Sequence, residues 1–204
     1  MVAIQPTHFN KANPIRPGTL LGKTDGTREI GRSTSLSLAI LKAYNFPSFS
    51  HMIFPEELNR INVDYLVTVP DRPYERFQAE IKRKFGWTAH VETRETDVFL
   101  LKLNHPNAPG LTPADNSSWE EWFAKHPQKA GLHQHNITAS HFAQLIEGLL
   151  PKPVIDKTGL TGNYDFQTRS FGSEEINQVF VDQLGLELVP SREPLEMLMV
   201  EKAK

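Results

Sequence analysis

The sequence predicts an α+β protein of two similar halves, each with helices packed on one face of a small, largely antiparallel sheet. The clearest helix spans residues 73–86, where Phe77, Ile81 and Phe85 recur every fourth position between charged residues and a glycine follows. Short runs rich in β-branched and aromatic residues flank it, as expected of strands. After a segment at residues 105–116 that is rich in Pro and Asn, the helix and strand patterns start again.

The first half is predicted to alternate strands with capped helices. In chain order we expect a strand at residues 2–5, an irregular arm at 6–26, a strand at 27–31, a helix capped by Ser33 or Thr34 and ended by Pro47, a helical turn at 55–58 and a strand at 63–69. The helix at 73–86 then leads into two strands, 87–92 and 97–103. We expect the polar residues 93–96 to join these strands as a hairpin.

The second half is predicted to follow the same order. We expect a short helix from Ser117 or Ser118, a strand at 132–137, a helix capped by Thr138, strands at 154–155 and 164–166, a helix from residues 173–175, and a hairpin of strands 186–189 and 195–200. This order fits an internal duplication, and it also fits two unrelated α+β halves. The predicted domains are residues 1–104, a linker with an aromatic insertion at 105–130, and residues 131–204.

The composition excludes several classes of protein. The chain has 22 Lys and Arg against 24 Asp and Glu, so it has no positive excess to attract nucleic acid. It has no cysteine, which excludes disulfides, thiolate metal sites and cysteine nucleophiles, and which fits an exported protein. No stretch approaches the roughly 18 apolar residues of a membrane span. We expect an extracytoplasmic protein whose leader is absent from this chain, because Met1 runs directly into a predicted strand.

The most sharply shaped stretch is residues 153–166, in which two glycine turns separate short strands. Asp156, Lys157 and Thr158 in the first turn, together with Asp165, offer carboxylates, an ammonium group and a hydroxyl to a ligand. The Asp and Thr side chains can equally satisfy the backbone of the turn itself. These four residues are candidate binding residues.

Two groups of histidines are candidates for metal binding or acid–base chemistry. His133 and His135 share a strand face, a spacing that zinc uses when a third ligand is available. His90 lies near Glu92 and Glu95 at the predicted hairpin, where cross-strand pairing explains these residues equally well. The chain has no nucleophile-elbow, phosphate-loop or His-Glu-x-x-His motif. We therefore expect no catalytic residues, no bound metal and no cofactor.

Three large aromatic residues lie close together in the predicted linker. Trp119, Trp122 and Phe123 are the aromatic group that the repeated elements require least. Aromatic side chains dominate the binding energy of protein interfaces, so these rings are candidates to anchor a partner. The alternative is that Trp119 and Phe123, four residues apart, attach the insertion to the body of the protein.

With these elements placed, the chain resembles a family of domains of unknown function that is abundant in soil bacteria. The matching segments are VAIQP at 2–6, YLVTVP at 65–70, RF at 76–77, FGW at 85–87, HVETRE at 90–95, PVIDKTGLTGNYDF at 153–166, QLGL at 183–186 and VEK at 200–202. Residues 119–129 depart from the pattern as an insertion. Members of that family are sometimes fused to thioredoxin-like domains or to sensor peptidases of the penicillin-receptor type. The resemblance implies an exported α+β domain and supplies no activity or binding residues.

The function expected from these observations is a non-catalytic, extracytoplasmic interaction module or accessory subunit that docks on another protein. The second half is also similar to the small βαβ modules at the periplasmic N-termini of secretins and TonB-dependent receptors, which bind other proteins. A cell-envelope hydrolase that uses dispersed His, Asp and Glu residues is one alternative. A metal-binding module is the other.

Overall fold

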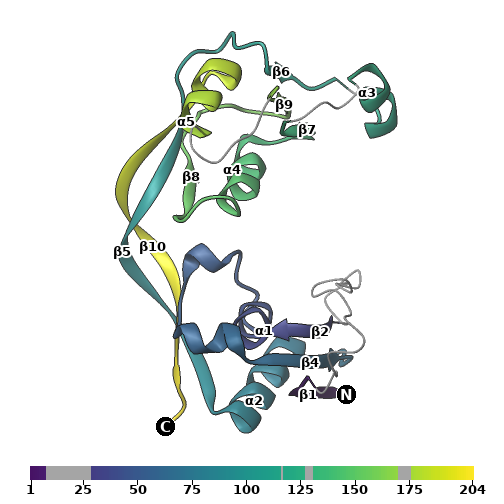
Figure 1. Ribbon diagram of the computed structural model, residues 1–204, viewed down its shortest axis with the longest axis vertical. Coiled ribbons are helices and arrows are strands. Elements are labelled where there is room, and N and C mark those ends of the chain that lie inside the picture. Colours follow the sequence, from purple (N-terminus) through teal and green to yellow (C-terminus); the bar gives the residue numbers. More distant parts are fainter. Residues whose placement is uncertain (8–28, 116, 127–130, 170–175) are drawn as a thin grey trace. The chain divides into compact units, whose positions relative to one another are not determined.

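The computed structural model describes residues 1–7, 29–115, 117–126, 131–169 and 176–204. In this part of the chain it has five α-helices and three sheets, which confirms the predicted α+β class. The chain divides into two compact units (Figure 1): unit 1 comprises Met1–Arg94 and Pro194–Lys204, and unit 2 comprises Glu95–Glu193. Each unit has its own hydrophobic core. None of the described helices is long and apolar enough to cross a membrane.

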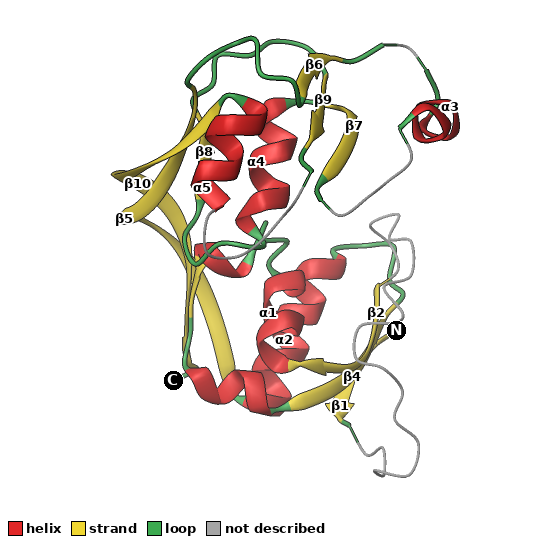
Figure 2. Ribbon diagram, turned by 45° about the horizontal axis from the view of Figure 1, so that its top comes forward, coloured by secondary structure: helices red, strands yellow, loops and turns green. Residues whose placement is uncertain are grey.

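Unit 1 is built on an antiparallel sheet with the strand order β1-β4-β2. Its elements are β1 (Val2–Pro6), β2 (Glu29–Ser35), α1 (Leu36–Ala43), a helical turn (Phe49–His51), β3 (Met52–Ile53), a second helical turn (Glu56–Arg60), β4 (Asn62–Val67) and α2 (Pro73–Phe85). Val63, Tyr65 and Val67 alternate along β4 and are buried in the core with α1 and α2, which pack side by side (Figure 2). Asp64 and Leu66 therefore point to the opposite, outer face.

Unit 2 contains a second antiparallel sheet with the order β6-β9-β7. Its elements are β6 (Leu111–Pro113), α3 (Trp119–Lys125), β7 (His133–Ile137), α4 (Ala139–Glu147), β8 (Val154–Asp156), β9 (Tyr164–Gln167) and α5 (Ile176–Val179), which continues as a wider helical turn (Phe180–Leu184). The rings of Phe142 on α4 and Phe166 on β9 stack with centroids 4.1 Å apart at the centre of its core. Asp165 on β9 consequently points to the outer face.

The two predicted hairpins are wrong, because each is one continuous strand. β5 is Trp87–Leu103 and β10 is Leu186–Lys202, and they lie in a third sheet with the order β3-β10-β5-β8. Backbone hydrogen bonds from Ala203 N to Gly86 O and from Asn104 N to Gly185 O, 2.9 and 2.7 Å, mark the two ends of an antiparallel pair. β8 pairs in parallel with β5 and β3 pairs in parallel with β10, so this sheet is mixed. Residues 93–96 contain no glycine or asparagine to favour a tight turn, and their threonines suit a strand.

Several predicted helices are confirmed with small changes of boundary. α2 begins with Pro73 and ends at Phe85. Gly86 caps it with a φ of 68°, the left-handed conformation that glycine supplies. Thr138 caps α4, as predicted, by accepting the backbone N–H of His141. The predicted helix start at residues 173–175 and most of the arm at 6–26 lie outside the described residues. The segment expected to be a linker, residues 105–130, contains β6 and α3.

The first helix cap is Ser35 rather than Ser33 or Thr34. The Ser35 hydroxyl accepts the backbone N–H of Leu38 at 3.2 Å. Ser33 is unable to serve because it lies two residues earlier in a bulge with a φ of 49°. Thr34 directs its hydroxyl to the carbonyl of Val63 instead.

The elements of the two units match in order and pairing. β6, β7, α4, β8 and β9 have the same order and pairing as β1, β2, α1, β3 and β4, and among the described residues α3 is present in unit 2 alone. Both central strand pairs shift register at the same place, between Gly31 and Thr34 in unit 1 and between Gln134 and Ile137 in unit 2. Corresponding residues of the two sheets can therefore be compared directly.

An aspartate holds this bulge in both units. Ser33 and Asn136 have φ values of 49° and 57°, the left-handed region that these residue types enter at a cost. Each donates its backbone N–H to an aspartate Oδ1 on the neighbouring strand, Ser33 to Asp64 at 2.8 Å and Asn136 to Asp165 at 3.0 Å. The carboxylate compensates for the strained backbone at each bulge.

Candidate functional site

Helix α3 contacts the outer face of the unit 2 sheet through one buried side chain, that of Trp122. The helix has seven residues, too few to be stable alone. Ser118 and Glu121 close its first turn as a capping box, since each side chain accepts the other residue's backbone N–H at 3.3 and 3.1 Å. Trp122 is only 1% exposed and anchors the helix.

The anchor point of α3 is the carboxylate of Asp165. The indole N–H of Trp122 donates to Oδ2 at 2.6 Å. His135 Nδ1 and the backbone N–H of Asn136 both donate to Oδ1, at 2.8 and 3.0 Å. Three donors therefore surround one buried carboxylate, which is the arrangement that offsets the cost of removing its charge from water.

His135 is set up to carry a positive charge beside Asp165. Its second ring nitrogen, Nε2, faces the carbonyl of Ser117 at 3.0 Å, so both nitrogens face acceptors and both must donate. Burial by itself lowers the pKa of His135. The hydrogen bonds to Ser117 and Asp165 and the negative charges of Asp165 and Asp115 outweigh burial, so the pKa is raised above its usual value. The result is a buried imidazolium–carboxylate pair.

Aromatic rings stack around this pair and leave one apolar face in solvent. The Trp122 ring stacks on the rings of His135 and His126, with centroids 5.1 and 4.8 Å away. Trp119 stacks on Trp122 at 5.4 Å, yet it is 44% exposed. Phe123 is 41% exposed and its ring centroid lies 6.0 Å from that of Trp119. α3 therefore holds two exposed aromatic rings in a defined position, and we refer to Trp119 and Phe123 as the aromatic pair.

The structure places the predicted ligand turn apart from this cluster. Asp156 Oδ1 accepts the backbone N–H and the hydroxyl of Thr158, at 2.9 and 2.8 Å, and its Oδ2 accepts the hydroxyl of Ser140. Lys157 is exposed, and its backbone N–H donates to Leu101 O in β5. Within the described residues, no hydrogen bond joins the turn to Asp165. The turn side chains satisfy the turn's own backbone.

The candidate histidines do not come together as a metal centre in the described part of the chain, where no group of three His, Asp or Glu residues has suitable geometry. His135 uses both ring nitrogens, and both ring nitrogens of His133 are buried without a hydrogen-bond partner. His90 is half exposed on β5 and lies 3.6 Å from Glu92 and 3.7 Å from Glu201. The two carboxylates and the imidazole are solvated and form a polar group at the surface.

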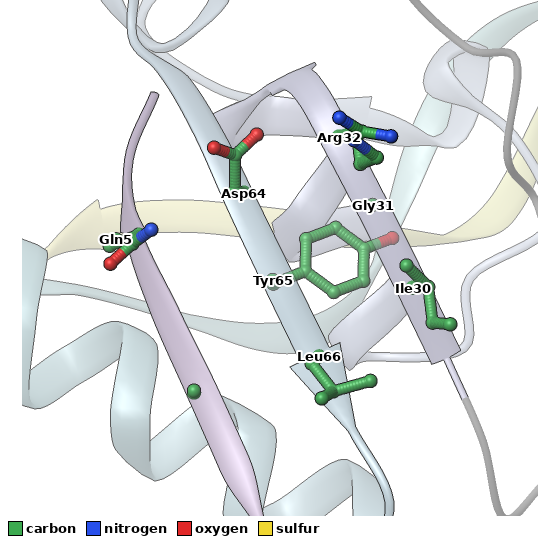
Figure 3. Close-up of a pocket in the computed structure, with 8 residues that line it drawn as sticks. Gln5, Ile30, Gly31, Arg32, Asp64, Tyr65 and Leu66 are labelled. Carbon is green, nitrogen blue, oxygen red and sulfur yellow. The ribbon is translucent and has the colours of Figure 1, made fainter. Parts of the chain in front are cut away.

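Unit 1 has a cavity of about 330 Å³ on its sheet, lined by residues of β1, β2 and β4 (Figure 3). These strands correspond to β6, β7 and β9 of unit 2. The lining residues are Ala3, Gln5, Ile30, Gly31, Arg32, Asp64, Tyr65 and Leu66. Gly31 is required here because a Cβ would lie 2.1 Å from the Tyr65 ring. The sequence analysis did not select any of these residues.

The chain matches one known protein family. Residues 67–203 match the model of a family described as "Protein of unknown function (DUF3738)", and this match covers more than half of the chain. The chain belongs to the DUF3738 family. A search of curated proteins and a search of solved structures found no match. The DUF3738 match includes α3, His135 and Asp165, whereas the cavity residues of unit 1 precede it.

Sequence analysis selected Asp165 and the α3 aromatics separately and missed the partner that joins them. His135 was predicted as a candidate for metal binding or acid–base chemistry. A sequence pattern that the two halves share could have identified the acceptor of this cluster. Asp64 and Asp165 each directly precede a core aromatic residue, Tyr65 and Phe166. That parallel indicates two equivalent carboxylates on outer sheet faces.

Proposed function

We propose that this protein is a non-catalytic, extracytoplasmic interaction module that docks on another protein through the aromatic pair, Trp119 and Phe123. The observation that carries the proposal is that the aromatic residues of α3 differ in burial. Trp122 is buried and hydrogen-bonded, while the neighbouring Trp119 and Phe123 are held at the surface. The extracytoplasmic location is part of the proposal and fits the absence of cysteine, since the chain has no thiol that could mispair in an oxidising compartment.

The geometry of the aromatic pair suits protein binding. Large rings bury much apolar area on association and dominate interface hot spots. The capping box and the Trp122–Asp165 hydrogen bond order the helix before a partner arrives, which reduces the entropy lost on binding. The exposed rings lie one helical turn apart, so one partner groove can take both.

Binding is favoured over hydrolysis because the most buried histidine is already occupied. A general base needs a ring nitrogen that can accept a proton, and both nitrogens of His135 donate to Asp165 and Ser117. His135 therefore holds α3 in place. The hydrolase and metal-binding alternatives have no comparable observation in their favour.

The test is site-specific photocrosslinking in the organism that makes the protein. A photoreactive phenylalanine analogue replaces Phe123, and the matched control carries it at Leu149, which is 56% exposed on the same unit. We expect one crosslinked polypeptide from position 123, at fixed stoichiometry and lost on Trp119→Ala, and none from position 149. Crosslinking that is equal at both positions, or unaffected by Trp119→Ala, would contradict the proposal.

We further propose that the two units arose by duplication of one module. The shared strand order, the bulges at Ser33 and Asn136, and the aspartates that hold them support this origin. An alignment of DUF3738 relatives tests it. If the duplication occurred, the columns from β1 through β5 (residues 1–103) align with those from β6 through β10 (residues 104–202) better than shuffled columns do.

A further inference from the structure

Unit 2 shows how the outer face of its sheet accepts an indole. The Trp122 ring stacks on the ring of His135 in β7, and its N–H donates to Asp165 Oδ2 in β9 at 2.6 Å. The ring is 1% exposed, so the interaction is fully desolvated. One acceptor oxygen and the stacked rings of His135, His126 and Trp119 hold the side chain.

Unit 1 has the same acceptor in the same position. Asp64 precedes the core residue Tyr65 and holds the bulge at Ser33, as Asp165 does for its own unit. Its Oδ1 accepts from the backbone of Ser33 at 2.8 Å and from the hydroxyl of Thr7 at 3.1 Å. In the described part of the chain, no hydrogen bond reaches Asp64 Oδ2, which is the atom equivalent to the indole acceptor.

Asp64 also lines a cavity on this sheet. Ile30, Leu66 and Ala3 line its apolar part, and Gln5, Arg32 and Asp64 contribute polar atoms from the three strands (Figure 3). Its volume of about 330 Å³ lies at the lower end of the range for small ligand sites, roughly 300–1,000 Å³. The cavity therefore has the mixture that a tryptophan side chain needs, an apolar wall and one hydrogen-bond acceptor.

We propose that this cavity binds a tryptophan side chain from a partner protein, with the indole N–H donating to Asp64 Oδ2 and the ring lying against Ile30 and Leu66. Tryptophan fits better than phenylalanine because only the indole supplies the donor. The chain's own tryptophans are at positions 87, 119 and 122, and none lies in residues 8–28. Trp87 and Trp122 are buried elsewhere, at 3% and 1% exposure.

The experiment uses the full chain and N-acetyl-tryptophanamide as the probe. Backbone amide resonances are followed by NMR while the probe is titrated. We expect saturable shifts at Asp64, Tyr65 and Leu66. The 1-methylindole analogue, which has no N–H, should bind about tenfold or more weakly, since a hydrogen bond to a charged group is lost.

Two variants and a control assign the effect to the cavity. Asp64→Asn keeps an oxygen for Ser33 and places an amide donor against the indole N–H, so binding should weaken about tenfold or more. Ala3→Phe fills the cavity without changing Asp64 and should abolish the shifts, which keeps the test valid if Asp64→Asn fails to fold. Asp97→Asn removes an exposed carboxylate of unit 2 and should leave binding unchanged.

Four outcomes would overturn the proposal. The first is the absence of saturable shifts, and the second is equal binding of the methylated probe, which would mean apolar partition without the hydrogen bond. Contacts from residues 8–28 to Leu66 in the free protein would mean that this chain fills the cavity itself. Concentration-dependent shifts that Trp119→Ala removes would identify a second copy as the occupant. The inference does not depend on the proposed function of α3.

Discussion

The outer sheet faces of the two units use one backbone device in two ways. In both, an aspartate next to a core aromatic accepts the N–H of a residue with positive φ. In unit 2, Asp165 is buried beside a histidine and an indole, whereas Asp64 in unit 1 is half-buried and bonds to Ser33 and Thr7. The two units therefore share the geometry of the bulge. They differ in what packs against the aspartate, and this decides how much the carboxylate contributes to the stability of each unit.

The largest expected effect is from Trp122→Ala. It removes a fully buried indole and leaves Asp165 with one donor fewer, so we expect a loss of about 3–5 kcal/mol from the stability of unit 2. Hydrogen exchange at unit 2 amides measures it. The matched control, Trp119→Ala, should cost about 1 kcal/mol or less because that ring is 44% exposed. Equal costs for the two variants would show that α3 is not anchored by Trp122.

The second prediction makes the same substitution in both units. Asp165→Asn leaves a buried imidazolium without its counter-charge and turns a donor toward Trp122, which should cost about 3 kcal/mol or more. Asp64→Asn keeps its bond to Ser33 and should cost about 1 kcal/mol. Chemical unfolding of each variant, with the slopes compared, gives the two values. If the order were reversed, the more important carboxylate would be that of unit 1.

The third prediction concerns pH and should be confined to unit 2. The folded-state pKa of His135 is raised, so its contribution to stability is fully present below the unfolded value of about 6.5 and is lost as pH rises through the folded value. We expect amides of α3 and β7 to exchange faster, after correction for intrinsic rates, as pH increases above about 6.5. His135→Gln should remove this dependence. A similar loss of protection in β1 and β4 would show that the effect has another source.

The smallest expected effect should be the same in the two units. Ser35 and Thr138 each accept an N–H in the first turn of the helix that follows the bulge, at 3.2 and 3.1 Å. Ser35→Ala and Thr138→Ala should each cost about 1 kcal/mol, measured by thermal unfolding. A difference well above that value would show that one of the side chains has a role beyond capping.

Local signals predicted the helices well. The period-four apolar stripe and the following glycine defined α2, Thr138 identified the start of α4, and the start of α3 was limited to Ser117 or Ser118, of which Ser118 is the cap. These features depend on bonds between residues three or four positions apart. Prediction failed where pairing is distant: residues 93–96 were interpreted as a turn, but they continue β5 because β10 supplies partners about a hundred residues away.

For the candidate site, too, local contacts were predicted and distant contacts were not. Asp156 and Thr158 satisfy their own turn, one of the two interpretations that the sequence allowed, because those hydrogen bonds are local. The joining of Trp122, His135 and Asp165 was beyond prediction, since a chain pattern does not specify which face of which strand a linker helix covers.

The sequence by itself determined the α+β class, the family, the ends of α2, the cap of α4 and the absence of cysteine chemistry, because composition and contacts within a few residues decide these properties. Only the tertiary structure decided that β5 and β10 are single long strands, that Trp122 is buried while Trp119 and Phe123 are exposed, and that Asp64 faces a cavity where Asp165 faces an indole. The physical reason is that burial and electrostatic pairing depend on segments distant in the chain, and folding alone brings those segments together.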